Sequence, residues 1–243
     1  ANSFTDINTF RGTWSDSASG ALTDRQLGES GSGSITTIAL SETSTTDPFS
    51  RCWGQWVSDP INGAVTMTAG SDTWQLCVGT QESSGLADMN LKVHIWVTIG
   101  DSDTVRGTLV DNDISSAEFG TTAVGDLFDN SATVALTNTV SIAAGDRIVV
   151  EIGYSAANPD TTTYTGTMWY GGTGSDLTDA GNETTLKGWV EFSGNVPSPS
   201  ASPSASPSLS PSASISQSAS PSASPSLSPS ASISPSASPS ASP

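Results

Sequence analysis

Basic residues are the scarcest chemical class in this chain: seven Lys and Arg stand against 24 Asp and Glu, for a formal net charge of −17. A surface so poor in cations repels phosphate backbones and anionic lipid, so we expect binding neither to nucleic acid nor to membrane surfaces. The chain also lacks an apolar run of the length that a transmembrane helix needs. We therefore expect no membrane insertion.

A single histidine, His94, limits the catalytic chemistry that the chain can host. A histidine-dependent hydrolase needs a nucleophile and an orienting acid, and the sequence has neither a GxSxG elbow nor a second histidine for a metal cluster. His94 is out of phase with the apolar positions around it, which predicts an exposed or edge side chain. Carboxylates are numerous enough for a glycosidase pair, but Glu151 and Glu191 fall at positions typical of solvated side chains. We expect no enzymatic activity.

Only two cysteines, Cys52 and Cys77, are present, and both fall in strand-like segments. In an extracellular protein the default expectation is one disulfide, which would close a loop of about 25 residues and contribute about 3 kcal/mol. Two separately buried thiols are the alternative that the cysteine count leaves open.

The last segment, 197–243, contains no charged, aromatic or glycine residue. Every even-numbered position from Ser198 to Ser242 is serine, and the unit 201–218 recurs at 219–236 with one substitution. Its apolar side chains are too few and too small to build a core, and frequent proline excludes a helix interior or a central strand. We expect a polyproline-II-like rod of roughly 145 Å, at about 3.1 Å per residue, or a disordered stalk.

Serine- and proline-rich composition is typical of O-glycosylated stalks. On a threefold helix, alternate serines visit all three faces, so their hydroxyls would ring the rod. The candidate O-glycosylation sites at its start are Ser198, Ser200, Ser202, Ser204, Ser206, Ser208, Ser210 and Ser212. An unmodified flexible linker is the alternative interpretation.

The residues before the tail predict one fairly large all-β domain. From Met89 to Ile99 apolar residues take every second position, the period-two pattern of a half-buried strand. The expected strands span 34–41, 50–60, 61–70, 73–81, 89–99, 104–110, 132–142, 147–156, 161–171 and 186–194, with loops at 111–130 and 172–185. The pattern favours an antiparallel β-sandwich of about ten strands, jelly-roll or immunoglobulin-like.

Three parts follow from this pattern: an N-terminal segment (1–33), the β-sandwich domain (34–196) and the tail (197–243). The N-terminal segment is ambiguous. Phe4, Ile7 and Phe10 are apolar, and a Ser/Gly-rich run follows at 28–33. It is either a first strand with a long loop, or an arm that donates a strand to a neighbouring subunit through these apolar side chains.

Five stretches of the domain resemble a known domain type: CWGQWVSDPINGAVTM, MNLKVHIWV, TVRGTLV, AAGDRIVVEIGY and GWVEFS. Together, over about 50–193, they resemble an uncharacterised β-sandwich domain of environmental phage structural proteins and bacterial surface or appendage proteins. The pair GDRIVVEIGY and GWVEFS is its most specific part. The resemblance implies no catalytic or ligand residues. The tail separately resembles the Ser/Pro repeats of algal wall glycoproteins and of glycan-coated fibrils.

Acidic loops and tryptophans provide weaker candidates. Asp111, Asp113 and Glu118 form a possible structural Ca²⁺ site, although ordinary turn chemistry explains such clusters equally well and no EF-hand spacing is present. Asn182 begins an N-glycosylation sequon. The seven tryptophans suggest either core and interface residues or a sugar-stacking platform, with Trp96 pointing away from the apolar face of its strand.

These observations favour a structural protein: an extracellular filament or virion-surface subunit that binds copies of itself and carries covalent glycans on its tail. An arm that binds a neighbour without closing a ring generates a filament. The alternative is a lectin-like adhesin on a glycosylated stalk, which predicts an exposed cluster of Trp or Tyr side chains.

Overall fold

The structure is a computed structural model of the chain. It describes residues 7, 9–17, 25–27, 34–43, 48–131, 133–157, 161–194 and 196–197. The chain divides into two units, Ala1–Pro203 and Ser204–Pro243, and all described residues belong to the first. Phe4 and the candidate glycosylation serines of the tail lie outside the described residues.

The described part of the chain is all-β, with fourteen strands and one short 3-10 turn, η1 (Phe128–Asn130). It contains two six-stranded sheets and one two-stranded sheet. Every pairing between named strands is antiparallel except those of β1 and β2, which run parallel to β4. No helix in the described residues is long and apolar enough to cross a membrane.

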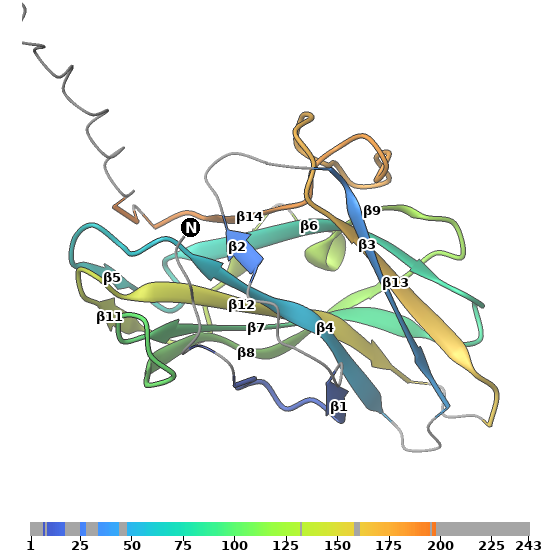
Figure 1. The fold of residues 1–243 in the computed structure, drawn as a ribbon, viewed down its shortest axis with the longest axis horizontal. Helices are drawn as coiled ribbons and strands as arrows, with labels where there is room; N and C mark the ends of the chain where they lie inside the picture. Colours follow the sequence, from blue (N-terminus) through green and yellow to red (C-terminus); the bar gives the residue numbers. More distant parts are fainter. Residues whose placement is uncertain are drawn as a thin grey trace, which may run out of the picture. The chain divides into compact units, whose positions relative to one another are not determined.

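The first sheet has the order β1-β4-β12-β7-β8, and β2 also pairs with β4 (Figure 1). Its strands are β1 (Asp16–Ser17), β2 (Arg25–Leu27), β4 (Phe49–Ser58), β7 (Met89–Thr98), β8 (Val105–Glu118) and β12 (Arg147–Ala156).

The second sheet has the order β10-β6-β13-β3, with β9 and β14 also pairing with β6. Its strands are β3 (Thr36–Glu42), β6 (Thr73–Glu82), β9 (Val124–Leu127), β10 (Val134–Ala135), β13 (Tyr164–Tyr170) and β14 (Trp189–Phe192). The small third sheet pairs β5 (Val65–Met67) with β11 (Val140–Ile142).

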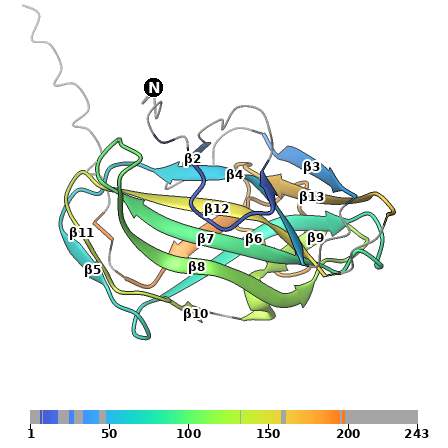
Figure 2. The same cartoon turned by 90° about the horizontal axis from the view of Figure 1, so that it is seen from below.

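The chain passes repeatedly from one large sheet to the other. Strands β3, β6, β9 and β13 belong to the second sheet, and β4, β7, β8 and β12 to the first. Only β7 and β8 follow one another within a sheet among these eight. The two sheets pack face to face (Figure 2), because one buried apolar cluster draws on both: Trp53 and Val150 from the first, Leu76 and Met168 from the second.

Alternation within the strands builds this core. In β7 the residues Leu91, Val93, Ile95 and Val97 all point into it, as the period-two pattern predicts. All ten residues of β12 are nevertheless buried, and so are all residues of β7 except Asn90, including those on the outer face of the sheet. Something other than solvent therefore covers that outer face.

A β-bulge at Trp53 links the sheets. In the β4–β12 pairing Ile152 lies opposite Gly54 and Gly153 opposite Cys52, so Trp53 is the extra residue. Its ring packs into the core, and its Nε1 donates to Gly166 O on β13 at 3.1 Å. A buried indole N–H thus finds an acceptor in the opposite sheet.

The strand prediction fails mainly in one region. The segment 111–130, expected as a loop, continues β8 to Glu118 and then forms β9. Bulges along the β7–β8 pairing and a positive φ of 53° at Asn112 interrupt the alternation. Ile114, moreover, is exposed. The period-two signal is therefore lost, although the strand continues.

The predicted disulfide does not form. Cys52 and Cys77 are both buried, and no disulfide joins them. Cys52 shares the outer face of the first sheet with its partner Gly153, and Cys77 lies between the core residues Leu76 and Val78, so it faces outward from the second sheet. The core separates them, which is the alternative with two buried thiols.

Candidate functional site

The outer face of the first sheet is covered by the N-terminal segment of the chain. Residues 9–15, here called the arm, contact β4, β12, β7 and β8, and they appear in dark blue over β12 in Figure 2. The residues that contact the arm are here called the socket. Six lie in the sheet and one, Asp103, lies in the turn between β7 and β8: Ser50, Gln55, Lys92, Trp96, Asp103, Asn112 and Glu151. The arm continues into β1, whose pairing with β4 extends it along the sheet edge.

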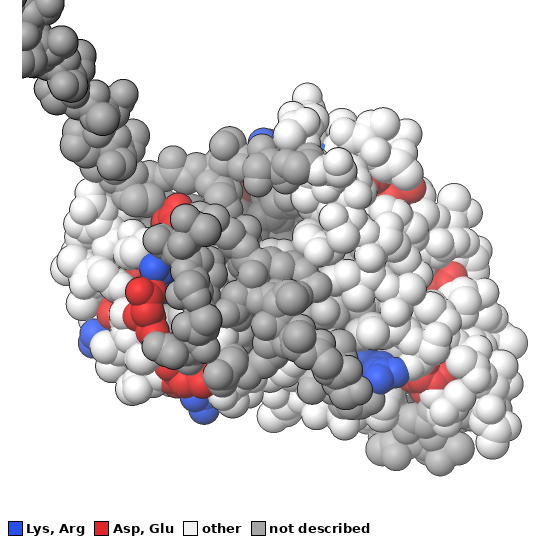
Figure 3. Space-filling view, viewed as in Figure 1, with Lys and Arg blue, Asp and Glu red and all other residues white. Residues whose placement is uncertain are grey.

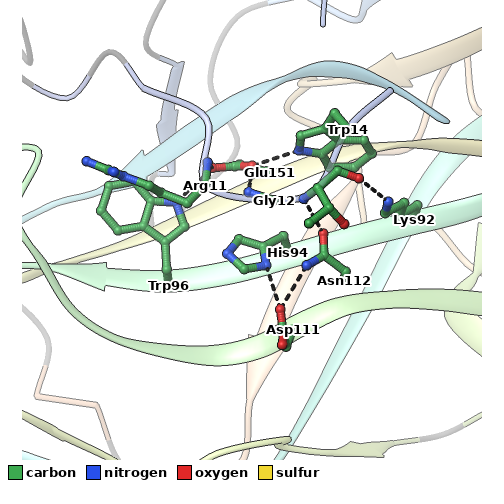
Figure 4. A network of polar contacts seen from close by, with 10 residues as sticks. Arg11, Gly12, Trp14, Lys92, His94, Trp96, Asp111, Asn112 and Glu151 are labelled. Atoms are coloured by element: carbon green, nitrogen blue, oxygen red, sulfur yellow. Dashed lines mark hydrogen bonds and ion pairs between the residues drawn. The ribbon is translucent and has the colours of Figure 1, made fainter. Parts of the chain in front are cut away.

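The Glu151 carboxylate is the centre of this site (Figure 4). Glu151 is fully buried, with 0% of the residue exposed. Its five hydrogen-bond donors are Arg11 N (2.7 Å), Gly12 N (2.9 Å), Trp14 Nε1 (2.8 Å), Trp96 Nε1 (2.9 Å) and Gln55 Nε2 (3.3 Å). All five partners are donors, which suits an ionised carboxylate because it only accepts.

The arm makes this buried charge tolerable. A carboxylate removed from water is costly unless it is fully hydrogen-bonded. Three of the five donors belong to the arm, and only Gln55 and Trp96 come from the sheet itself. Docking of the arm and burial of Glu151 therefore depend on each other.

Glycine at position 12 allows the close approach. A Cβ there would lie 2.6 Å from Trp14 Nε1 and 3.0 Å from both Glu151 Oε2 and His94 Cβ. A side chain at Gly12 would therefore push the backbone donors away from the carboxylate.

Two cationic side chains, Lys92 of the sheet and Arg11 of the arm, also join the arm to the sheet. The Lys92 ammonium donates to Thr13 O at 2.5 Å and to Ser50 Oγ at 3.3 Å, and lies 4.9 Å from the ring centroid of Trp14. Burial lowers the pKa of Lys92. The Arg11 guanidinium lies over the Trp96 ring at 5.7 Å. Both cations thus bridge arm and sheet by contacts with aromatic faces.

The two ends of the arm are also fixed. At the first end Thr9 Oγ1 donates to Asp103 Oδ2 at 2.9 Å. Within the arm Thr13 N donates to Asn112 Oδ1 at 2.6 Å. At the other end Ser15 and Ser50 exchange bonds, each backbone N–H donating to the other's hydroxyl at 3.1 Å. The arm is therefore held by contacts along its whole length.

A small apolar cluster lies beside the arm and separate from the main core. It consists of Ile7, Val57, Trp96 and Val149, all fully buried. Trp96 thus points away from the apolar core, as predicted. Ile7, predicted as an inter-subunit residue, packs on its own chain, and Phe10 is half-buried.

His94 contradicts its predicted exposure. It is 3% exposed, because the arm covers it, and neither ring nitrogen has a hydrogen-bond partner among the described residues. Its Nδ1 lies 3.7 Å from Asp111 Oδ1. Burial lowers the pKa of His94; Lys92 acts in the same direction, while Glu151 and Asp111 oppose it. A catalytic base is hydrogen-bonded to the nucleophile that it activates, and no described residue is hydrogen-bonded to His94 in this way.

Glu151 likewise contradicts its predicted solvation, whereas Glu191 is exposed as expected. Of the other buried carboxyl groups, Glu82 and Asp126 have a raised pKa, and both lie outside the site. Burial raises the pKa of Glu82 to about 7, and the neighbouring Glu118 adds to the effect. Burial also raises the pKa of Asp126 to about 6.

The predicted calcium ligands do not converge. Asp111 faces His94, the electrostatic neighbour of Asp113 is Asp129, and that of Glu118 is Glu82. The three are spread along β8, and no group of three or more metal-ligating side chains exists among the described residues.

The remaining candidates have simple positions. Asn182 is exposed, and its Oδ1 accepts from Thr184 Oγ1 at 2.6 Å within the sequon. No tryptophan or tyrosine of the described residues is exposed; each is buried or half-buried. The exposed aromatic cluster that a lectin would present is therefore not found there. On the side seen in Figure 3 the described surface is largely uncharged.

Comparison with known proteins gives little. No family model and no curated protein matches the chain. Among solved structures, one of infectious bursal disease virus strain Gx is 18% identical with a TM-score of 0.19, covering 65% of this chain and 35% of that one. One of strain Gt is 16% identical with a TM-score of 0.15, covering 56% and 39%. The match thus spans little more than a third of the viral chains, and such low TM-scores support no argument about fold or function.

Proposed function

We propose that this chain is a non-enzymatic structural subunit of an extracellular filament or virion-surface appendage. The observation that carries the proposal is the arm and its socket. A sheet face holds a fully buried carboxylate that receives three of its five donors from an extended segment. Such a face is built to bind a length of chain, and binding of chain segments to sheets is a common means of subunit assembly.

We further propose that the body is a jelly roll. Eight of its strands form two four-stranded sets, β3-β13-β6-β9 and β4-β12-β7-β8, and the chain crosses between the sets at nearly every step. A jelly roll has eight strands in two sheets. Proteins with this fold have many different functions, so the fold is consistent with a structural role but is not evidence for it.

The tail and the charge balance support the same role. A Ser/Pro repeat without aromatic or charged residues suits an O-glycosylated rod or spacer on an extracellular particle. The scarcity of basic residues disfavours nucleic acid as a partner. The expected partners are copies of the chain and covalent glycans.

Self-association of the full chain tests the proposal. Sedimentation velocity over a range of concentrations should show species heavier than the 24.7 kDa monomer that grow with concentration, and electron microscopy should show regular particles. A chain that stays monomeric at all concentrations overturns it. For the tail, intact-mass measurement of protein from the organism that makes it should show hexose increments, and peptide mapping should place them in 197–243. A bare mass overturns the glycan-bearing rod.

A further inference from the structure

The socket needs an arm, but its chemistry does not require that the arm belong to the same chain. Without an arm Glu151 would keep only Gln55 and Trp96 as donors. Loss of Ile7, which precedes the arm, would also open the apolar cluster that it forms with Val57, Trp96 and Val149. An empty socket is therefore unfavourable on both polar and apolar grounds.

The arm is a self-contained binding segment. Its contacts with the socket all come from one stretch of seven residues. Backbone groups make many of them, namely the N–H groups of Arg11, Gly12, Thr13 and Ser15 and the carbonyl of Thr13. Identical groups on another copy would make identical bonds.

The connection to the domain is long enough to reach a neighbour. Residues 18–35 join β1 to β3 and include the run GESGSGS at 28–34. Fully extended, eighteen residues span up to roughly 60 Å at about 3.3 Å each. Described pairing within this stretch is limited to the three residues of β2. Exchange of such an element between identical subunits keeps the arm–socket contacts, loses at most the short β2 pairing, and is a low-cost route to assembly.

We propose that, in assemblies of this chain, the socket of one copy is occupied by residues 9–15 of a neighbouring copy. The inference rests on the proposed function, since it names the contact by which the subunits join. The occupant is a second copy of this chain and no other partner.

A cysteine pair tests the exchange directly. The Ser15 and Ser50 hydroxyl oxygens lie 3.4 Å apart across the arm–socket contact. S15C and S50C are made as separate chains, mixed at a concentration at which the full chain assembles, and oxidised. We expect a covalent dimer, at least fivefold above that from S15C mixed with S71C, whose serine is exposed outside the socket. Peptide mapping should place the bond between positions 15 and 50. A dimer yield equal to that of the control overturns the inference.

Complementation gives a second measurement that needs no disulfide. Gly12→Ala damages the arm and keeps the socket, whereas Glu151→Ala damages the socket and keeps the arm. Neither variant alone should assemble, while an equimolar mixture should regain dimers, because one intact arm meets one intact socket. Absence of recovery overturns the inference.

Sedimentation of the wild-type chain under the same conditions distinguishes failure of the arm exchange from failure of the proposed structural function. Assembled particles without the covalent dimer or recovery mean that the subunits join by another contact, and the structural function stands. Absence of any assembly overturns the proposed function together with the exchange.

Discussion

At the scale of the residue, the main feature is a set of buried polar groups at strand positions for which the alternation pattern predicts exposure to solvent. Glu151 and His94 lie opposite one another on β12 and β7, on the outer face of the sheet, and both are buried. The arm covers both side chains, and its residue Arg11 lies 140 positions from Glu151 in the sequence. Substitution at these positions therefore reports on the arm rather than on the core.

Removal of the Glu151 carboxylate is expected to destabilise the domain. Glu151→Ala leaves the indole N–H groups of Trp14 and Trp96 without their acceptor, and we expect a loss of about 2–4 kcal/mol in the free energy of unfolding. Urea unfolding followed by tryptophan fluorescence measures it. Glu191→Ala, at an exposed glutamate, serves as the control and should change stability by about 0.5 kcal/mol or less. Equal effects of the two substitutions would contradict the role given to Glu151.

The two cysteines are expected to react as thiols only after unfolding. Burial raises the pKa of Cys77 to about 12, with Asp126 and Asp179 adding to the effect, so its reactive thiolate is scarce at neutral pH. Iodoacetamide without reductant should therefore label slowly in buffer and add two groups per chain in denaturant. Reductant should leave the unfolding midpoint unchanged. A chain that takes up no label in denaturant unless it is first reduced would show the disulfide instead.

Glu82 is expected to make stability fall with rising pH. Its pKa is about 7 in the folded chain and about 4.5 unfolded, so the folded state binds more protons between these values. The free energy of unfolding should then decrease as pH rises from 4.5 to 7, by at most about 3 kcal/mol. Glu82→Gln should flatten this slope, measured by urea unfolding across the window, and Glu191→Gln should leave it intact. An unchanged slope in Glu82→Gln would assign the dependence to other groups.

At the scale of the element, strands with a continuous alternation were predictable and interrupted strands were not. The segments of β7, β12 and β13 follow from side chains that alternate within the element itself. The second half of β8 was missed, because its bulges and the exposed Ile114 break the period.

The socket was missed for a different reason. A glutamate on the outer face of a strand has the same local pattern whether water or a distant segment covers it, so alternation cannot distinguish the two. The one available signal was the concentration of Lys92, His94 and Trp96 on one face of the best strand. Large and charged groups at successive outward positions are material for a binding face.

The arm as an element is expected to depend on Gly12. A methyl group at this position meets Trp14 Nε1, Glu151 and His94, and such overpacking costs about 1–3 kcal/mol. In Gly12→Ala the amides of 9–15 should exchange hydrogen at least about tenfold faster, as measured by mass spectrometry of that peptide. Gly63→Ala is the matched control, since its Cβ meets only Pro197 at 3.4 Å. Equal exchange in wild type and Gly12→Ala would show that the arm is not held in this way.

At the scale of the whole molecule, the elements needed for folding and the proposed contact all lie in the first unit. The main core, the socket and the arm fall between Ile7 and Val196, whereas the tail contributes a repeat without aromatic residues. A segment of that composition cannot bury enough apolar surface to fold by itself. The first unit should therefore keep both its stability and its capacity to assemble when the tail is removed.

Truncation after Pro203, the boundary between the two units, tests this division. The free energy of unfolding of chain 1–203 should stay within about 0.5 kcal/mol of the full chain, because no core residue is lost. Its sedimentation should still show concentration-dependent particles, since the arm and socket are retained. The particles should be less soluble if the tail acts as a hydrophilic spacer. A truncated chain that is equally stable but monomeric would move the assembly contact from the sheet face to the tail, and the arm would then serve its own domain alone.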